Sequence, residues 1–152
     1  MNIEIYTDGS CHTQKLIGAW VAIILVNEEK TIISGVEQNT THQRMELTAV
    51  IHAISYVQQH FGYEIAFTIV TDSQYVMGLL DRAEKLIAQN FTSKKGNETR
   101  NVDLVKTFYQ LRKKSTISFL KIKAHQPRTA NTINYNNEAD GIVKNLVRNE
   151  LK

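Results

Sequence analysis

The chain has little of what builds a secreted, membrane-bound or multidomain protein. Its one cysteine, Cys11, excludes an internal disulfide and a zinc site made of cysteines. The only proline is Pro127, and no linker, repeat or low-complexity tract interrupts the 152 residues. No apolar run could span a bilayer, and the start, Met1–Glu4, lacks the basic and apolar segments of a signal peptide. We therefore expect a cytoplasmic monomer without membrane association, folded as a single domain over residues 1–152.

The charged residues are unevenly distributed along the chain. The formal net charge is only +3. Residues 1–81, however, carry three basic and nine acidic side chains, a net −6, whereas residues 82–152 carry fifteen and six, a net +9. An acidic half joined to a basic half is typical of a cation site beside a surface that binds a polyanion. Unevenly scattered surface charge that serves only solubility explains these numbers equally well.

Hydrophobic periodicity predicts three strands in the first part of the chain. Residues 3–8 alternate apolar and polar side chains and end at Asp8-Gly9, which predicts a strand that runs into a turn. Residues 18–26 are nearly all apolar, and residues 31–38 return as a third strand after a turn at 28–30. The short connections predict an antiparallel meander.

From residue 41 onward the hydrophobic period becomes helical. The pattern predicts a helix over 43–60 that ends before Gly62, and then a strand over 65–71. The remaining predicted elements are helices from Gln74, over 82–89 and over 101–113, a strand over 117–123, and a closing helix from Tyr135. The order β-β-β-α-β-α-α-α-β-α predicts an α/β fold. Its five-stranded mixed sheet would combine the meander with parallel crossovers, have helices on its faces and have the first strand at its centre.

Four carboxylates lie at comparable places in these predicted elements. Asp8 and Asp72 end strands, whereas Glu46 and Asp140 lie in the first turns of helices. Each has a local explanation: Asp8 forms a turn, Glu46 complements the helix dipole, Asp72 or Ser73 caps a helix, and Asp140 is solvated. Gathered together, however, four like charges would raise one another's pKa and destabilise the fold unless a cation offset them.

The chemistry of these four side chains limits which cation they could hold. They offer only oxygen ligands, which favour Mg²⁺ or Mn²⁺. Two such ions about 3.5–4 Å apart can activate water and stabilise the leaving oxygen of a phosphodiester.

Six segments resemble, in order, the motifs of type 1 ribonuclease H. They are Thr7–Cys11, Arg44–Leu47, Thr71–Val76, Asn101–Leu104, Lys123–His125 and Asn136–Asp140. The resemblance covers almost the whole chain and implies a ribonuclease-H-like fold. It also implies endonucleolytic hydrolysis of the RNA strand of RNA–DNA hybrids, which leaves 3′-hydroxyl and 5′-phosphate ends.

The resemblance also assigns roles to the acidic residues and to one histidine. Asp8, Glu46, Asp72 and Asp140 would hold two Mg²⁺ ions, for which Mn²⁺ could substitute. Asp8 would bridge the ions, and Glu46 would also lie near the 2′-hydroxyl that distinguishes RNA from DNA. His125 matches the family's mobile histidine, which assists proton transfer or product departure, and a near-neutral pKa suits that role. A lone surface or core histidine is the alternative.

Contacts with the hybrid follow from the same resemblance. Thr41 and Asn101, with Arg44 nearby, would bind a DNA-strand phosphate, unless Thr41 only caps its helix and Arg44 only pairs with a neighbour. The other candidates are Gln14 in the loop 11–18, His42, Gln43 and Gln74 at the minor groove, and Lys94 and Lys95 in the basic segment 82–100.

Three features depart from the family pattern. The loop 11–18 lacks the usual Gly/Pro content, and His42-Gln43 replaces a frequent Asn-Asn pair. The segment 82–100 has no tryptophan and fewer positive charges than the strongest examples, which predicts weaker non-specific binding.

Two other functions fit a fold of this kind. A nucleic-acid-binding module with a silent site would not need four carboxylates. Transposase and integrase cores lack the Arg44–Leu47 and Lys123–His125 segments and usually carry additional DNA-binding domains.

Overall fold

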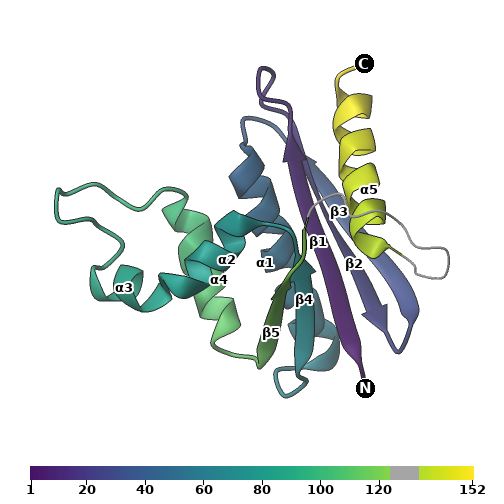
Figure 1. Ribbon diagram of the computed structural model, residues 1–152, viewed down its shortest axis with the longest axis horizontal. Coiled ribbons are helices and arrows are strands. Elements are labelled where there is room, and N and C mark those ends of the chain that lie inside the picture. Colours follow the sequence, from purple (N-terminus) through teal and green to yellow (C-terminus); the bar gives the residue numbers. More distant parts are fainter. Residues whose placement is uncertain (124–133) are drawn as a thin grey trace.

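The computed structural model describes residues 1–123 and 134–152, so the candidate His125 lies outside the described residues. Within these ranges the elements follow the predicted order (Figure 1). The strands are β1 (Ile3–Cys11), β2 (Gly18–Val26), β3 (Glu29–Glu37), β4 (Phe67–Thr71) and β5 (Ile117–Lys121). The helices are α1 (His42–Phe61), α2 (Gln74–Asp81), α3 (Ala83–Ala88), α4 (Val102–Arg112) and α5 (Tyr135–Glu150).

The five strands form one mixed sheet in the order β3-β2-β1-β4-β5. β2 is antiparallel to both β1 and β3, whereas β4 is parallel to both β1 and β5. The predicted meander with parallel crossovers is therefore confirmed, and β1 is the central strand.

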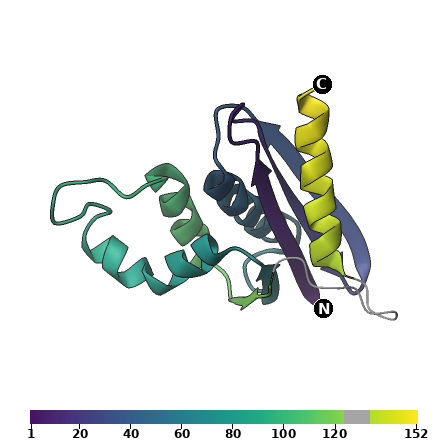
Figure 2. The ribbon, with the colours of Figure 1, turned by 45° about the horizontal axis from the view of Figure 1, so that its top comes forward.

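Helices cover both faces of the sheet, as predicted. Ile3 and Ile5 of β1 belong to the larger core cluster, which contains the apolar face of α1. Tyr6 points to the opposite face and packs with Ala139 and Val143 of α5. Figures 1 and 2 show α5 on one side of β1 and β2 and α1 on the other. None of the helices in the described ranges is long and apolar enough to cross a membrane.

The boundaries of α1 follow from local chemistry. The Thr41 side chain accepts a hydrogen bond from the backbone N–H of Arg44 at the amino end. At the other end Gly62 adopts φ +86°, and its N–H donates to the carbonyl of Gln58. The helix therefore ends before Gly62, as the sequence predicts.

Two of the predicted turns are wrong. β1 does not end at Asp8-Gly9 but continues to Cys11, and Asp8 pairs with Val21. The hairpin between β2 and β3 turns at Asn27 and Glu28, both at positive φ, and β3 already begins at Glu29. A two-residue loop with two positive φ angles matches the right-handed twist of the strands, and Asn tolerates this conformation.

Candidate active site

Asp8 lies in the interior of the central strand and is 7% exposed. Because side chains alternate along a strand, it shares the α5 face of the sheet with Tyr6. The backbone N–H of Gly9 donates a 2.8 Å hydrogen bond to Asp8 Oδ1. The carboxylate is therefore held by the strand that carries it.

Gly9 brings the helix layer close to this strand. A Cβ built on Gly9 would lie 2.4 Å from both the carbonyl carbon of Met45 and the backbone nitrogen of Glu46. Only glycine lets α1 lie this close to β1. The contact places Glu46, whose side chain is 11% exposed, beside the strand that carries Asp8.

Strand register aligns Asp72 with Asp8. Tyr6 of β1 is paired with Val70 of β4, and Asp8 and Asp72 each follow two residues later. Asp72 does not cap α2 with its side chain, because Ser73 Oγ is the acceptor for the N–H of Val76 at 3.1 Å. The interpretation of Asp72 as an N-cap is therefore wrong.

Asp140 comes from α5, which packs on the same face of the sheet as Asp8. Its neighbours Ala139 and Val143 are buried against Val21, the β2 partner of Asp8. Lys144, one turn later, forms a 3.0 Å ion pair with Asp140. Both Glu46 and Asp140 lie in the second turn of their helices, since α1 begins at 42 and α5 at 135, so their prediction as first-turn residues is wrong.

Asp8, Glu46, Asp72 and Asp140 are hereafter called the carboxylate edge, and the other three act electrostatically on Asp8. The pKa of Asp8 is raised to about 7, first by burial, then by Asp72, and to a smaller extent by Asp140 and Glu46. The hydrogen bond from Gly9 opposes this shift but does not cancel it. A buried group whose ionisation is disfavoured by several like charges is typical of a functional site.

His42 contacts the carboxylate edge through Glu46, and the sequence analysis did not predict this contact. Its Nε2 lies 3.4 Å from Glu46 Oε2, and Glu46 raises the pKa of His42 mainly through this hydrogen bond, while burial opposes the change. The signal was present in the sequence, because residues 42 and 46 are spaced i, i+4 on a predicted helix.

The amino ends of α1 and α4 meet at a second cluster of polar side chains. Arg44 forms a bidentate ion pair with Asp103, at 2.9 and 3.0 Å, and this pair holds the pKa of Asp103 below its usual range. Arg44 Nη1 also lies 3.4 Å from Asn101 Oδ1. Asn101 adopts φ +58° and donates a 3.1 Å hydrogen bond to the hydroxyl of Tyr75. Thr41, Arg44 and Asn101 therefore lie near one another, and the alternative roles of Thr41 and Arg44, cap and ion pair, are both observed.

Comparison with known proteins identifies the family. A sequence model described as RNase H matches residues 1–148. The chain is 35% identical to a Ribonuclease H of Hahella chejuensis over 85% of each chain. It is 30% identical to one of Thermoanaerobacter sp. strain X514, over 99% of this chain and 92% of the relative. A Ribonuclease H of Caldicellulosiruptor saccharolyticus is 29% identical over 96% of each chain.

The chain belongs to the RNase H family. The α/β fold and the central position of β1 agree with this assignment. Among the other candidates, Gln43 is half-buried in the first turn of α1, and Gln74 is the exposed first residue of α2. Gln14 is exposed in the connection between β1 and β2, and Lys94 and Lys95 are exposed in the connection between α3 and α4, which extends away from the sheet (Figure 1).

The ligand chemistry of the carboxylate edge suits a divalent metal ion, although its side chains do not form a complete coordination shell. It offers only hard oxygen ligands, and burial together with the neighbouring carboxylates raises the pKa of Asp8, so a bound cation would favour its ionised form. Within residues 1–123 and 134–152, no three His, Cys, Asp or Glu side chains form a group that could hold a metal ion by themselves. Mg²⁺ keeps several waters and needs only one or two protein carboxylates besides substrate phosphates. In an RNase H protein the carboxylate edge is therefore suited to an open metal site.

Proposed function

We propose that this protein is an endoribonuclease that hydrolyses the RNA strand of RNA–DNA hybrids with the help of divalent metal ions and leaves 3′-hydroxyl and 5′-phosphate ends. The single observation that carries the proposal is the buried Asp8 with three further carboxylates acting on it. Membership of the RNase H family and relatives with the name Ribonuclease H support it. The proposed catalytic unit is residues 1–152 acting as a monomer.

The proposed metal ligands are Asp8, Glu46, Asp72 and Asp140. Two bound Mg²⁺ ions, or Mn²⁺ in their place, would supply an activated water and stabilise the leaving oxygen. The chain itself contributes the positions of its oxygens: register aligns Asp8 with Asp72, and the Gly9 contact brings Glu46 close. His42 orients Glu46, which we assign to the side of the 2′-hydroxyl of the RNA. His125 remains the proposed proton carrier.

Thr41, Arg44 and Asn101 form the proposed site for a phosphate of the DNA strand. Their proximity supports this assignment, and Asp103 already holds the Arg44 guanidinium in place. Gln43 and Gln74 are proposed to contact the minor groove, and Gln14 the RNA strand. Lys94 and Lys95 would add a salt-sensitive contact with the nucleic-acid backbone.

The experiment that tests the proposal compares four labelled substrates, each with Mg²⁺ or EDTA. They are RNA–DNA hybrid, double-stranded RNA, single-stranded RNA and double-stranded DNA. Asp72→Asn should abolish metal-dependent internal cuts in the RNA of the hybrid. Asp81→Asn is the matched control, because Asp81 is an exposed aspartate at the end of α2 and outside the carboxylate edge. Binding of hybrid without cutting, in Mg²⁺ and Mn²⁺ alike, would instead identify a nucleic-acid-binding module with a silent site.

A further inference from the structure

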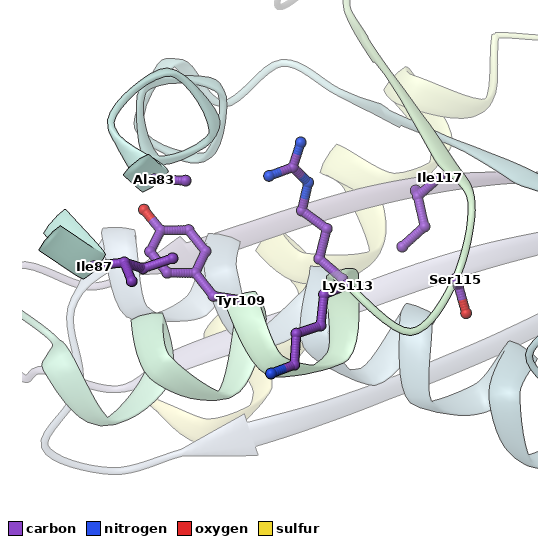
Figure 3. A pocket seen from close by; sticks show the side chains of 7 residues that line it. Ala83, Ile87, Tyr109, Lys113, Ser115 and Ile117 are labelled. Atoms are coloured by element: carbon purple, nitrogen blue, oxygen red, sulfur yellow. The ribbon is translucent and has the colours of Figure 1, made fainter. Parts of the chain in front are cut away.

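A groove between α3 and α4 lies outside the proposed catalytic site. It consists of two hollows of about 350 Å³ each, which share Ile87, Tyr109 and Lys113 and are therefore adjacent. Figure 3 shows Ala83 and Ile87 of α3 on the side facing Tyr109 of α4, with Lys113 on the next turn of α4. We call this feature the α3–α4 groove.

The floor of the α3–α4 groove is apolar, and its rim is cationic. Ala83, Ile87, Phe91 and Tyr109 provide the apolar surface, and Ile87 is 55% exposed although it is a large aliphatic side chain. The charged side chains on the rim are Lys106, Arg112 and Lys113. Within the described residues no acidic side chain lines either hollow, and none forms an ion pair with these three cations.

One end of the groove lies at the end of β4 that is opposite to the carboxylate edge. One hollow reaches Ser115 and Ile117, and Ile117 pairs with Phe67 at the amino end of β4. Asp72 follows the opposite end of the same strand, five residues and therefore about 17 Å further along. A hybrid held at the carboxylate edge would leave this end of the groove accessible.

The side chains of the groove suit a peptide better than a nucleic acid. Single strands bind by stacking bases on exposed aromatic rings. Here Tyr109 is only 7% exposed, and its hydroxyl donates to the carbonyl of Leu79 at 2.6 Å. Lys106 Nζ lies 5.3 Å from the centre of the Phe91 ring and thus covers a face of it. The most exposed apolar side chain is instead the aliphatic Ile87, which lines both hollows and offers a contact for a bulky apolar side chain.

We propose that the α3–α4 groove docks an acidic segment of a partner protein, with an apolar side chain of that segment on Ile87 and its carboxylates beside Lys113, Arg112 and Lys106. The cations on the rim have no acidic partner among the described residues, so charge complementarity selects an acidic occupant. The apolar floor then distinguishes this occupant from polyanions that have no apolar side chains.

The test uses a short fluorescein-labelled peptide with aspartates around a central leucine–phenylalanine pair, measured by fluorescence anisotropy against the full chain. We expect saturable binding that Lys113→Glu weakens about fivefold or more. The matched control is Lys114→Glu, which makes the same charge change on the adjacent exposed residue outside both hollows and should weaken binding less than twofold. Ile87→Ser should weaken binding by a similar factor without a change of charge.

Control ligands separate this proposal from simple charge attraction. A peptide with serines in place of the leucine–phenylalanine pair should bind at least about fivefold more weakly, and oligothymidylate should not compete. Equal loss in Lys113→Glu and Lys114→Glu, equal binding of the serine peptide, or competition by oligothymidylate would overturn the proposal, and the last result would identify a nucleic-acid surface. Hybrid cleavage by Lys113→Glu should equal that of the unchanged protein, so the outcome is independent of the proposed ribonuclease activity.

Discussion

The carboxylate edge and the α3–α4 groove carry opposite charge and differ in how their side chains are held. Asp8 is buried in the central strand and is aligned with Asp72 by register. The helix beside it approaches the strand so closely that a methyl group would not fit between them. The groove is lined by side chains of α3 and α4, and Ile87 is more than half exposed. Charges that destabilise the fold must be positioned by packing, whereas charges that only attract a ligand can remain on a solvated rim. The following predictions test this contrast, from the largest expected effect to the smallest.

Asp8→Asn should separate function from stability at the carboxylate edge. We expect hybrid cleavage in Mg²⁺ to fall by at least about 10³-fold, because the central oxygen ligand is lost. In EDTA at pH 8, unfolding by urea should require about 2–4 kcal/mol more than for the unchanged protein, since a carboxylate with its pKa raised to about 7 no longer has to ionise in a buried place.

The pH dependence of the stability of the same variant shows whether ionisation of Asp8 stabilises or destabilises the fold. Because the folded-state pKa of Asp8 is raised, its protonated form favours the fold below about pH 4, and this contribution is lost as the pH rises through about 7. The stability difference between Asp8→Asn and the unchanged protein should therefore vanish near pH 3 and be complete by pH 8. A constant difference over this range would show that the stabilisation has another cause.

Gly9→Ala should break the packing that brings Glu46 to the carboxylate edge. The new Cβ meets backbone atoms of Met45 and Glu46 rather than a flexible side chain, so we expect a loss of about 2–4 kcal/mol in the free energy of unfolding. Gly78→Ala in α2 is the matched control. No atom lies within 4 Å of a Cβ there, and the substitution should stabilise the helix by about 0.5–1 kcal/mol. Similar results for the two variants would show that α1 does not need to approach β1 this closely.

His125→Ala tests whether a proton carrier assists the carboxylate edge. We expect kcat to fall by about 100-fold while KM for the hybrid and the thermal midpoint stay the same, because this is the lower end of what general acid–base assistance contributes. A loss as complete as that of Asp8→Asn would contradict the role of an assisting residue, and an unchanged kcat would remove His125 from the reaction.

Arg44→Ala and Asp103→Asn separate an ion pair from a phosphate contact. Both remove the same bidentate pair, whose Asp103 side is 63% exposed, so both should lower the free energy of unfolding by about 0.5–1 kcal/mol. Arg44→Ala removes the guanidinium itself and should weaken binding of hybrid by about three- to tenfold in a filter-binding assay, more than Asp103→Asn, which removes only the group that holds it in place. Equal affinities of the two variants for hybrid would assign Arg44 to structure alone.

The double substitution of Lys94 and Lys95 by glutamine should produce the smallest effect. Both lysines are exposed, so stability should not change. The slope of log affinity for hybrid against log salt should become shallower by about one to two, because each phosphate contact releases condensed counterions. An unchanged slope would show that the connection between α3 and α4 does not contact the substrate.

Local patterns in the sequence predict most of the sheet and helices, and tertiary contacts explain the errors. The alternation from Ile3 onward correctly predicts a strand, but Asp8-Gly9 resembles a turn because the reason for Gly9 is a helix that passes over it and lies more than thirty residues away in the chain. In the same way, the position of the turn at Asn27-Glu28 is set by the pairing of β2 with β3, and this pairing requires positive φ angles at both residues.

In the candidate site too, local sequence patterns predict some features, whereas others depend on tertiary packing. The four carboxylates could be selected because the sequence predicts them at ends of strands and near starts of helices, although Asp8 lies inside β1, and the register of β1 and β4 then aligns two of them. The ion pair between His42 and Glu46 could be predicted from helical spacing. The α3–α4 groove could not, because its lining residues become neighbours only when the two helices pack.

The contact between Gly9 and α1 also makes the proposed chemistry depend on close docking of the helix layer. The sheet alone can align Asp8 with Asp72, but Glu46 arrives only when the helix layer is fully seated against the central strand. An intermediate with a formed sheet and a loosely docked α1 would therefore be unable to cut nucleic acid. Cleavage would then depend on correct docking of the two layers. A nascent or damaged chain with a poorly docked α1 would be inactive although the rest of its fold was formed.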